Sequence, residues 1–317
     1  MAQHLPFVMQ QLFNRPHALS VGTADMIVAA LSGRLDIKAL ASESDVLDRR
    51  ALEDLASMGR RTADERTAQD KDRPGVAGDN EWWGETPYRL TETGVALIPV
   101  KGVLKRTWGV GPYSGATGYD GIWTQILHAY DNPLVKAMWF DINSGGGAVD
   151  GMFDLTDGIY QMSERFGGKP IYAMCADYAA SAAYAIAAAC DTVMVPRLGQ
   201  VGSIGCVIMH AEFSKMLEED GINVNIIRSR SRKARGSEIE ALDQQTLDEF
   251  QEMVDECDEV FTEAVVRYRG ENRITKNAIG EMDGRVYSGP RALATGLVDY
   301  VLSEPEAWMM MEQQIAA

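Results

Sequence analysis

Ser181 and Lys233 are the residues of this chain best suited to covalent chemistry. Ser181 lies in a run of small residues, 179–184, and Lys233 lies in the loop-like stretch 232–236. A glycine turn at 143–147 follows an apolar run upstream. A serine nucleophile, an amine base and a turn that presents backbone N–H groups are the parts that acyl transfer needs when no histidine takes part.

The small residues around Ser181 leave room for a substrate backbone. Because a helix is expected to begin here, unpaired N–H groups lie nearby, and the N–H of Ala182 could face a developing oxyanion. The N–H of Gly146 or Gly147 would be the second donor. The alternative interpretation is structural: a small-residue helix packed on a sheet, and a tight turn or an anion-binding nest.

A lysine acts as a general base only where its pKa falls toward neutrality, and burial or neighbouring positive charges have that effect. Four arginines flank Lys233 in the sequence: Arg228, Arg230, Arg232 and Arg235. Ser203, in a Gly-Ser-Ile-Gly turn, would hold the lysine amine in place. The alternatives are a solvated basic loop and a hydroxyl that closes its own turn.

Composition restricts the possible functions. The 317 residues are 46% apolar, which suffices for one large domain or two ordinary ones, and the net charge of −16 argues against nucleic-acid binding. The four cysteines form no C-x-x-C pair, so we expect reduced, buried thiols in a cytoplasmic protein. The four histidines show no metal-ligand spacing, and we expect neither a metal nor a cofactor.

No signal peptide is expected at the N-terminus, and the alanine-rich stretch 171–195 fits strand, helix and strand better than a membrane span. The sequence divides into a helical segment (1–58), a polar linker or mobile loop (59–89), a main domain (90–303) and a C-terminal tail (304–317). From these features we expect a protein that is not secreted.

Alternation of strands and helices from residue 94 onward predicts an α/β fold with a largely parallel sheet. Ligands bind at the carboxyl ends of strands in such folds, so the glycine turn and Ser181 should share one edge of the sheet. The expected strands are 95–100, 135–142, 170–175, 192–195, 224–227 and 298–302. The expected helices are 120–130, 149–166, 179–190, 211–219, 242–268 and one near Ala292.

In this order and spacing, the motifs resemble family S49 of the serine peptidases, the signal peptide peptidase A group. The phage branch, the capsid assembly proteases of the minor capsid protein C type, is the most similar. The resemblance covers roughly 90–303, and Gly145 and Arg230 depart from it where the family has proline and glycine. The segments that carry it are 112–119, 143–149, 179–184, 201–205, 230–236, 284–289 and 294–299.

The resemblance implies a ClpP/crotonase-like fold, a repeated β-β-α core with an N-terminal helical extension, and an ATP-independent Ser–Lys dyad. The implied roles are nucleophile for Ser181, general base for Lys233, orientation of the lysine for Ser203, and oxyanion hole for the N–H groups of Gly146 or Gly147 and Ala182.

The resemblance also implies a homo-oligomer that cleaves scaffold, portal or other head proteins inside the prohead, in the host cytoplasm. From the charge and the lack of a membrane span we expect neither nucleic-acid nor membrane contact. The alanines around Ser181 indicate small or apolar residues before the scissile bond. Two alternatives remain: a non-catalytic capsid component with a peptidase-like fold, and a crotonase-type acyl-CoA enzyme.

Overall fold

The computed structural model describes residues 17–19, 86–112 and 115–316. The expected helical segment 1–58, apart from 17–19, and most of the linker 59–89 lie outside the described residues. The chain divides into two compact units. The larger unit comprises the described parts of 18–205 and 261–317, and the smaller unit comprises the described parts of 1–17 and 206–260.

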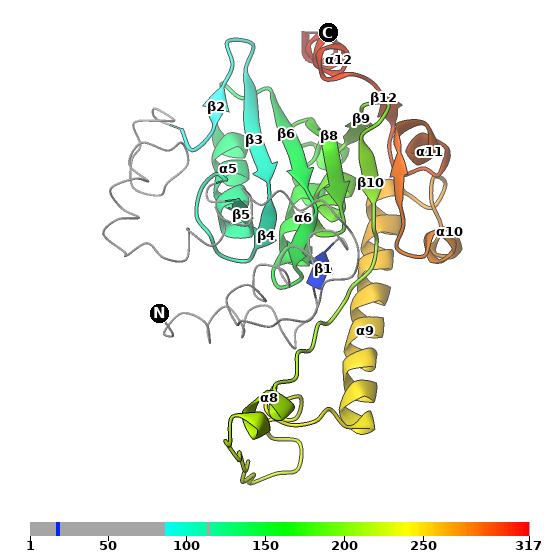
Figure 1. The fold of residues 1–317 in the computed structure, drawn as a ribbon. Coiled ribbons are helices and arrows are strands. Elements are labelled where there is room, and N and C mark those ends of the chain that lie inside the picture. The colour runs from blue at the N-terminus through cyan, green and yellow to red at the C-terminus, as the bar shows by residue number, and fades with distance from the viewer. Residues whose placement is uncertain (1–16, 20–85, 113–114, 317) are drawn as a thin grey trace. The chain divides into compact units, whose positions relative to one another are not determined.

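The larger unit is built on a sheet with the strand order β11-β10-β8-β6-β3-β2 (Figure 1). Its four central strands are parallel, and the two edge strands β2 and β11 run antiparallel to their neighbours. Strands β9 and β12 extend the sheet beside β8. The bounds are β2 Arg89–Leu90, β3 Val95–Lys101, β6 Ala137–Ser144, β8 Ile171–Ala180, β9 Thr192–Val195, β10 Gln200–Gly202, β11 Val286–Ser288 and β12 Tyr300–Val301.

The central strands are apolar runs because both faces of the sheet are covered. Helices packed against the sheet bury them, and α7 is buried along its whole length. Helix α12 adds a core cluster in which Trp308 packs edge-on against Trp139 at 5.0 Å. The helices are α5 Tyr119–Asp131, α6 Met152–Gln161, α7 Ala182–Ala189, α10 Lys276–Met282, α11 Gly289–Ala294 and α12 Glu304–Ala316, with a 3₁₀ turn at Glu164–Phe166.

A second, four-stranded sheet has the order β1-β7-β4-β5. Gly147 of β7 pairs with Leu104 of β4, and a Cβ on this glycine would lie 1.9 Å from the Leu104 carbonyl oxygen, so only glycine permits the approach. The strands are β1 His17–Leu19, β4 Val103–Lys105, β5 Ala116–Gly118 and β7 Gly146–Ala148.

The smaller unit contains α8 (Ser214–Glu219) and the first part of α9 (Gln244–Arg269), the helix that continues into the larger unit. A disulfide joins Cys206 to Cys257 at the α9 end of this unit. The expectation of four reduced thiols is therefore wrong for this pair. Cys175 and Cys190 are free and buried, and burial raises the pKa of the Cys175 thiol to about 12.

The α/β class with a largely parallel sheet is confirmed, and three expected elements differ. Residues 224–227 form no strand, because none of the described residues pairs with them, and Ile227 is 97% exposed. The expected helix 149–166 ends at Gln161. The expected helix 179–190 begins only at Ala182, since residues 179 and 180 finish β8. Among the described helices, none is long and apolar enough to cross a membrane.

Candidate active site

Ser181 stands alone between a strand and a helix. Strand β8 ends at Ala180 and α7 begins at Ala182, and Ser181 takes φ 58° and ψ −122°. A non-glycine residue with positive φ costs about 1–3 kcal/mol and persists only where its surroundings impose it. Here the Ser181 N–H donates to the Gly202 carbonyl oxygen at 2.7 Å, and its own carbonyl accepts the N–H of Ala185 at 3.0 Å.

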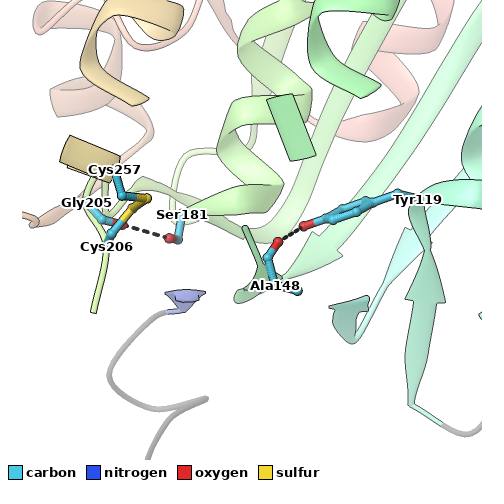
Figure 2. The surroundings of a disulfide bond; sticks show 6 residues. All are labelled: Tyr119, Ala148, Ser181, Gly205, Cys206 and Cys257. Carbon is cyan, nitrogen blue, oxygen red and sulfur yellow. Dashed lines mark hydrogen bonds between the residues drawn. A yellow bond between two sulfur atoms is a disulfide. The ribbon is translucent and has the colours of Figure 1, made fainter. Parts of the chain in front are cut away.

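The Ser181 side chain is buried in the described structure, with an exposed fraction of 0%. Its hydroxyl donates to the Gly205 carbonyl oxygen at 3.5 Å, a long and weak hydrogen bond (Figure 2). A serine on a strained turn between a strand and a helix is a recurrent way to present a nucleophile at the edge of a sheet. The long hydrogen bond leaves the hydroxyl free to change partner.

The glycine turn lies directly against Ser181. Gly146 has φ +96°, and a Cβ placed on it would lie 3.0 Å from the Ser181 Cβ. The strand register agrees, because Ser144 of β6 pairs with Ala179 of β8. The prediction that the glycine turn and the serine share one edge of the sheet is confirmed.

Ser144 organises this turn and was not singled out by the sequence. Its hydroxyl donates to the Gly102 carbonyl oxygen at 2.5 Å and accepts the N–H of Gly146 at 3.1 Å. The sequence feature that could have identified Ser144 is its position two residues before Gly146, because a serine hydroxyl commonly bonds the backbone N–H two residues on. The Gly146 N–H is thus occupied, and an oxyanion that binds it must replace the Ser144 hydroxyl.

Of the other two candidate oxyanion donors, the N–H groups of Ala182 and Gly147, only that of Ala182 lies next to Ser181. Ala182 is the first residue of α7, where N–H groups have no partner within the helix. Gly147 instead serves the close contact between β7 and β4. The larger unit therefore brings Ser181, Gly146 and Ala182 together.

Ser203 belongs to the same unit as Ser181 and also has positive φ, 52°. Its N–H donates to the Arg285 carbonyl oxygen at 2.8 Å, next to strand β11. This backbone hydrogen bond fixes the turn that carries the hydroxyl. The expected role of that hydroxyl in orienting a lysine stays a prediction.

Lys233 belongs to the smaller unit and is exposed. Its N–H donates to the Arg230 carbonyl oxygen at 3.0 Å, and its carbonyl accepts a hydrogen bond from the Arg228 side chain at 2.7 Å. The next residue, Ala234, has φ 61°. A tight turn thus presents the lysine, and its pairing with Ser181 stays a prediction.

The basic residues around Lys233 are balanced by glutamates. Arg228 is ion-paired with Glu240, and hydrogen bonding to this arginine lowers the pKa of the Glu240 carboxyl. Arg235 and Arg232 both reach Glu249, at 3.1 and 3.3 Å. Three of the four arginines that flank Lys233 in the sequence are therefore paired with acidic residues.

The family profile of Peptidase family S49 matches residues 164–317, a range that includes Ser181, Ser203 and Lys233. The resemblance to family S49 is confirmed. The chain is also similar to two phage proteins. The chain is 32% identical over 246 residues to head-tail preconnector protein GP5 of Enterobacteria phage P21, covering 76% of this chain and 48% of that protein.

The second phage protein is capsid assembly protease C of Escherichia phage lambda, which is 28% identical over 316 residues. That alignment covers 99% of this chain and 67% of the phage lambda protein. The chain thus spans about half the length of the first phage relative and two thirds of the second. Among solved structures, a ClpP1 mutant from Listeria monocytogenes is similar with a TM-score of 0.41 and 13% identity, over 68% of this chain and 94% of that one.

Proposed function

We propose that this protein is a serine endopeptidase that cleaves head proteins during phage capsid maturation. Ser181 is the nucleophile, Lys233 the general base and Ser203 the residue that orients the lysine. The observation that carries the proposal is the strained turn of Ser181 directly against Gly146. The names of the two phage relatives support the assignment of substrates.

The chemistry follows from the roles of these groups. The Ser181 hydroxyl attacks the scissile carbonyl carbon while the neutral Lys233 amine takes its proton. The N–H groups of Gly146 and Ala182 stabilise the oxyanion, and each such donor contributes about 10²–10³ in rate. The C–N bond then breaks, the leaving amine takes the proton from the lysine, and water hydrolyses the ester on Ser181.

The substrates in this proposal are scaffold, portal or other head proteins, and the enzyme works as a homo-oligomer inside the prohead in the host cell. The peptidase domain comprises 90–303, preceded by an N-terminal extension and a linker. The acidic balance of the chain, −16, supports protein rather than nucleic-acid partners. The turn at Lys233 supports its role because it fixes the backbone on both sides of that residue.

Coexpression with the neighbouring head genes tests the proposal. Mass spectrometry of the head proteins should show specific cleavage with the wild type, and Ser181→Ala and Lys233→Ala should each abolish it. Removal of a general base alone costs about 10²–10⁴ in rate. A trace of residual cleavage would therefore agree with the proposal in Lys233→Ala but not in Ser181→Ala.

Two matched controls separate chemistry from folding. Ser163→Ala removes another buried serine of the larger unit, whose hydroxyl donates to the Tyr160 carbonyl oxygen at 2.8 Å. Lys215→Ala removes another exposed lysine of the smaller unit. Both should cleave as the wild type does. Undiminished cleavage by Ser181→Ala would remove this serine as the nucleophile.

A further inference from the structure

A short segment from the N-terminal part of the chain lies at Ser181. Strand β1, residues 17–19, forms the edge of the second sheet and pairs with β7, the strand that begins at Gly146. In Figure 2, β1 is the blue strand beside the Ser181 side chain. A strand added to an exposed sheet edge is the way many proteins bind extended peptides.

The carbonyl oxygen of Ala18 lies against Gly146, the glycine that approaches Ser181. A Cβ on Gly146 would lie 2.1 Å from the Ala18 carbonyl oxygen and 3.0 Å from the Ser181 Cβ. Both atoms therefore lie within 3.0 Å of one point beside Gly146. A peptide carbonyl next to a serine and a glycine turn is the arrangement that acylation of the serine requires.

The strand is also firmly held and well covered. Within the smaller unit, His17 exchanges two backbone hydrogen bonds with Val207, at 2.8 and 2.9 Å, in an antiparallel bridge. Ala18 and Ser181 both have an exposed fraction of 0%. Ser181 is thus closed to solvent in the state in which Ala18 lies beside Gly146.

We propose that β1 occupies the position of the substrate strand and that the Ala18–Leu19 peptide bond is a self-cleavage site. The inference rests on the proposed function, because it needs a peptidase at Ser181. Ala18 then precedes the scissile bond, and its small side chain suits the alanine-rich surroundings of the serine. Removal of residues 1–18 frees the position for other proteins.

The cleavage is an ordinary hydrolysis. The Ser181 oxygen bonds to the Ala18 carbonyl carbon and gives its proton to the base. The bond to the Leu19 nitrogen breaks, and that nitrogen takes the proton. Water then splits the ester, which leaves a carboxylate on Ala18, a free amine on Leu19 and the serine restored. The described state precedes attack, because Ser144 still holds the Gly146 N–H.

Intact-mass spectrometry and N-terminal sequencing of the purified full chain test the site. The wild type should lose residues 1–18 with time and gain a new N-terminus at Leu19, and Ser181→Ala should stay whole. Ala18→Ser keeps a small side chain and should be cut like the wild type. Ala18→Arg places a long charged side chain at a buried position, and we expect self-cleavage to slow by about 10²-fold through misplacement of the carbonyl.

Cleavage of coexpressed head proteins, measured in parallel, separates the two proposals. Head proteins cut by a chain whose bond after residue 18 stays intact would overturn the self-cleavage site and leave the peptidase assignment standing. No cleavage of either kind would overturn both. Equal rates for Ala18→Arg and Ala18→Ser, or a cut after residue 18 in Ser181→Ala, would also refute the site.

Discussion

Substitution of Gly146 by alanine tests the geometry on which the candidate active site depends. The new methyl group would lie 2.1 Å from the Ala18 carbonyl oxygen and 3.0 Å from the Ser181 Cβ, and the backbone would keep φ +96°. Left-handed backbone costs about 1–2 kcal/mol for a residue other than glycine, and overpacking adds about 1–3 kcal/mol. We therefore expect Gly146→Ala to lose about 2–5 kcal/mol of unfolding free energy.

The effect on activity should exceed the effect on stability. In the proposed mechanism the methyl group would occupy the space of the scissile carbonyl and disturb the Gly146 N–H, and removal of one oxyanion donor costs about 10²–10³ in rate. The measurements are urea unfolding and the rate of head-protein cleavage under conditions in which the variant is folded.

Gly167→Ala is the matched control. Gly167 has φ +82°, and a Cβ on it would meet no atom within 4 Å. Gly167→Ala should lose only the unfolding free energy that left-handed backbone costs, about 1–2 kcal/mol, and should keep wild-type activity. If Gly146→Ala cleaves as fast as Gly167→Ala, the close approach of Gly146 to Ser181 has no part in catalysis and the reasoning fails.

Three further predictions concern the disulfide, a buried ion pair and the glycine turn. Cys257→Ser opens a loop of 51 positions and should cost about 4 kcal/mol in urea unfolding without reductant; an unchanged midpoint would show that the bond to Cys206 contributes nothing. Burial alone would raise the pKa of Asp299, but hydrogen bonds from buried Arg269 outweigh it and the pKa is lowered. This stabilisation is present above the unfolded pKa of about 3.9 and is lost as pH falls through the lower folded value. Asp299→Asn should therefore flatten this part of the acid-unfolding curve and cost about 3–5 kcal/mol at neutral pH, whereas an unaltered curve contradicts the assignment. Ser144→Ala should slow head-protein cleavage more than it lowers stability, because the turn loses its bond to the Gly146 N–H; equal cleavage rates would make that hydroxyl irrelevant.

The sequence predicts the central sheet well because its strands are specified locally. The run 95–100 is apolar and is buried between neighbours on both sides, and the run after residue 135 behaves in the same way. The approach of the glycine turn to Ser181 also follows from strand order alone. These features need only hydrophobic pattern and the rule for the carboxyl ends of parallel strands.

The sequence fails where distant segments decide the structure. The short strand β5 consists of Ala-Thr-Gly, which has little strand preference, and it forms because β4 supplies hydrogen bonds. Conversely, 224–227 is predicted to be a strand from its apolar residues but lacks a partner in the described part of the chain. The Cys206–Cys257 pair and the position of Ala18 likewise depend on residues far apart in sequence.

The left-handed backbone of Ser181 has a consequence for protein engineering. Glycine would adopt these dihedral angles without the penalty that serine carries, so Ser181→Gly should stabilise the backbone at this position while it removes the proposed nucleophile. Selection for thermal stability alone would therefore favour variants at this position that lack peptidase activity. Engineering for higher stability should keep Ser181 unchanged and introduce stabilising substitutions elsewhere in the sheet.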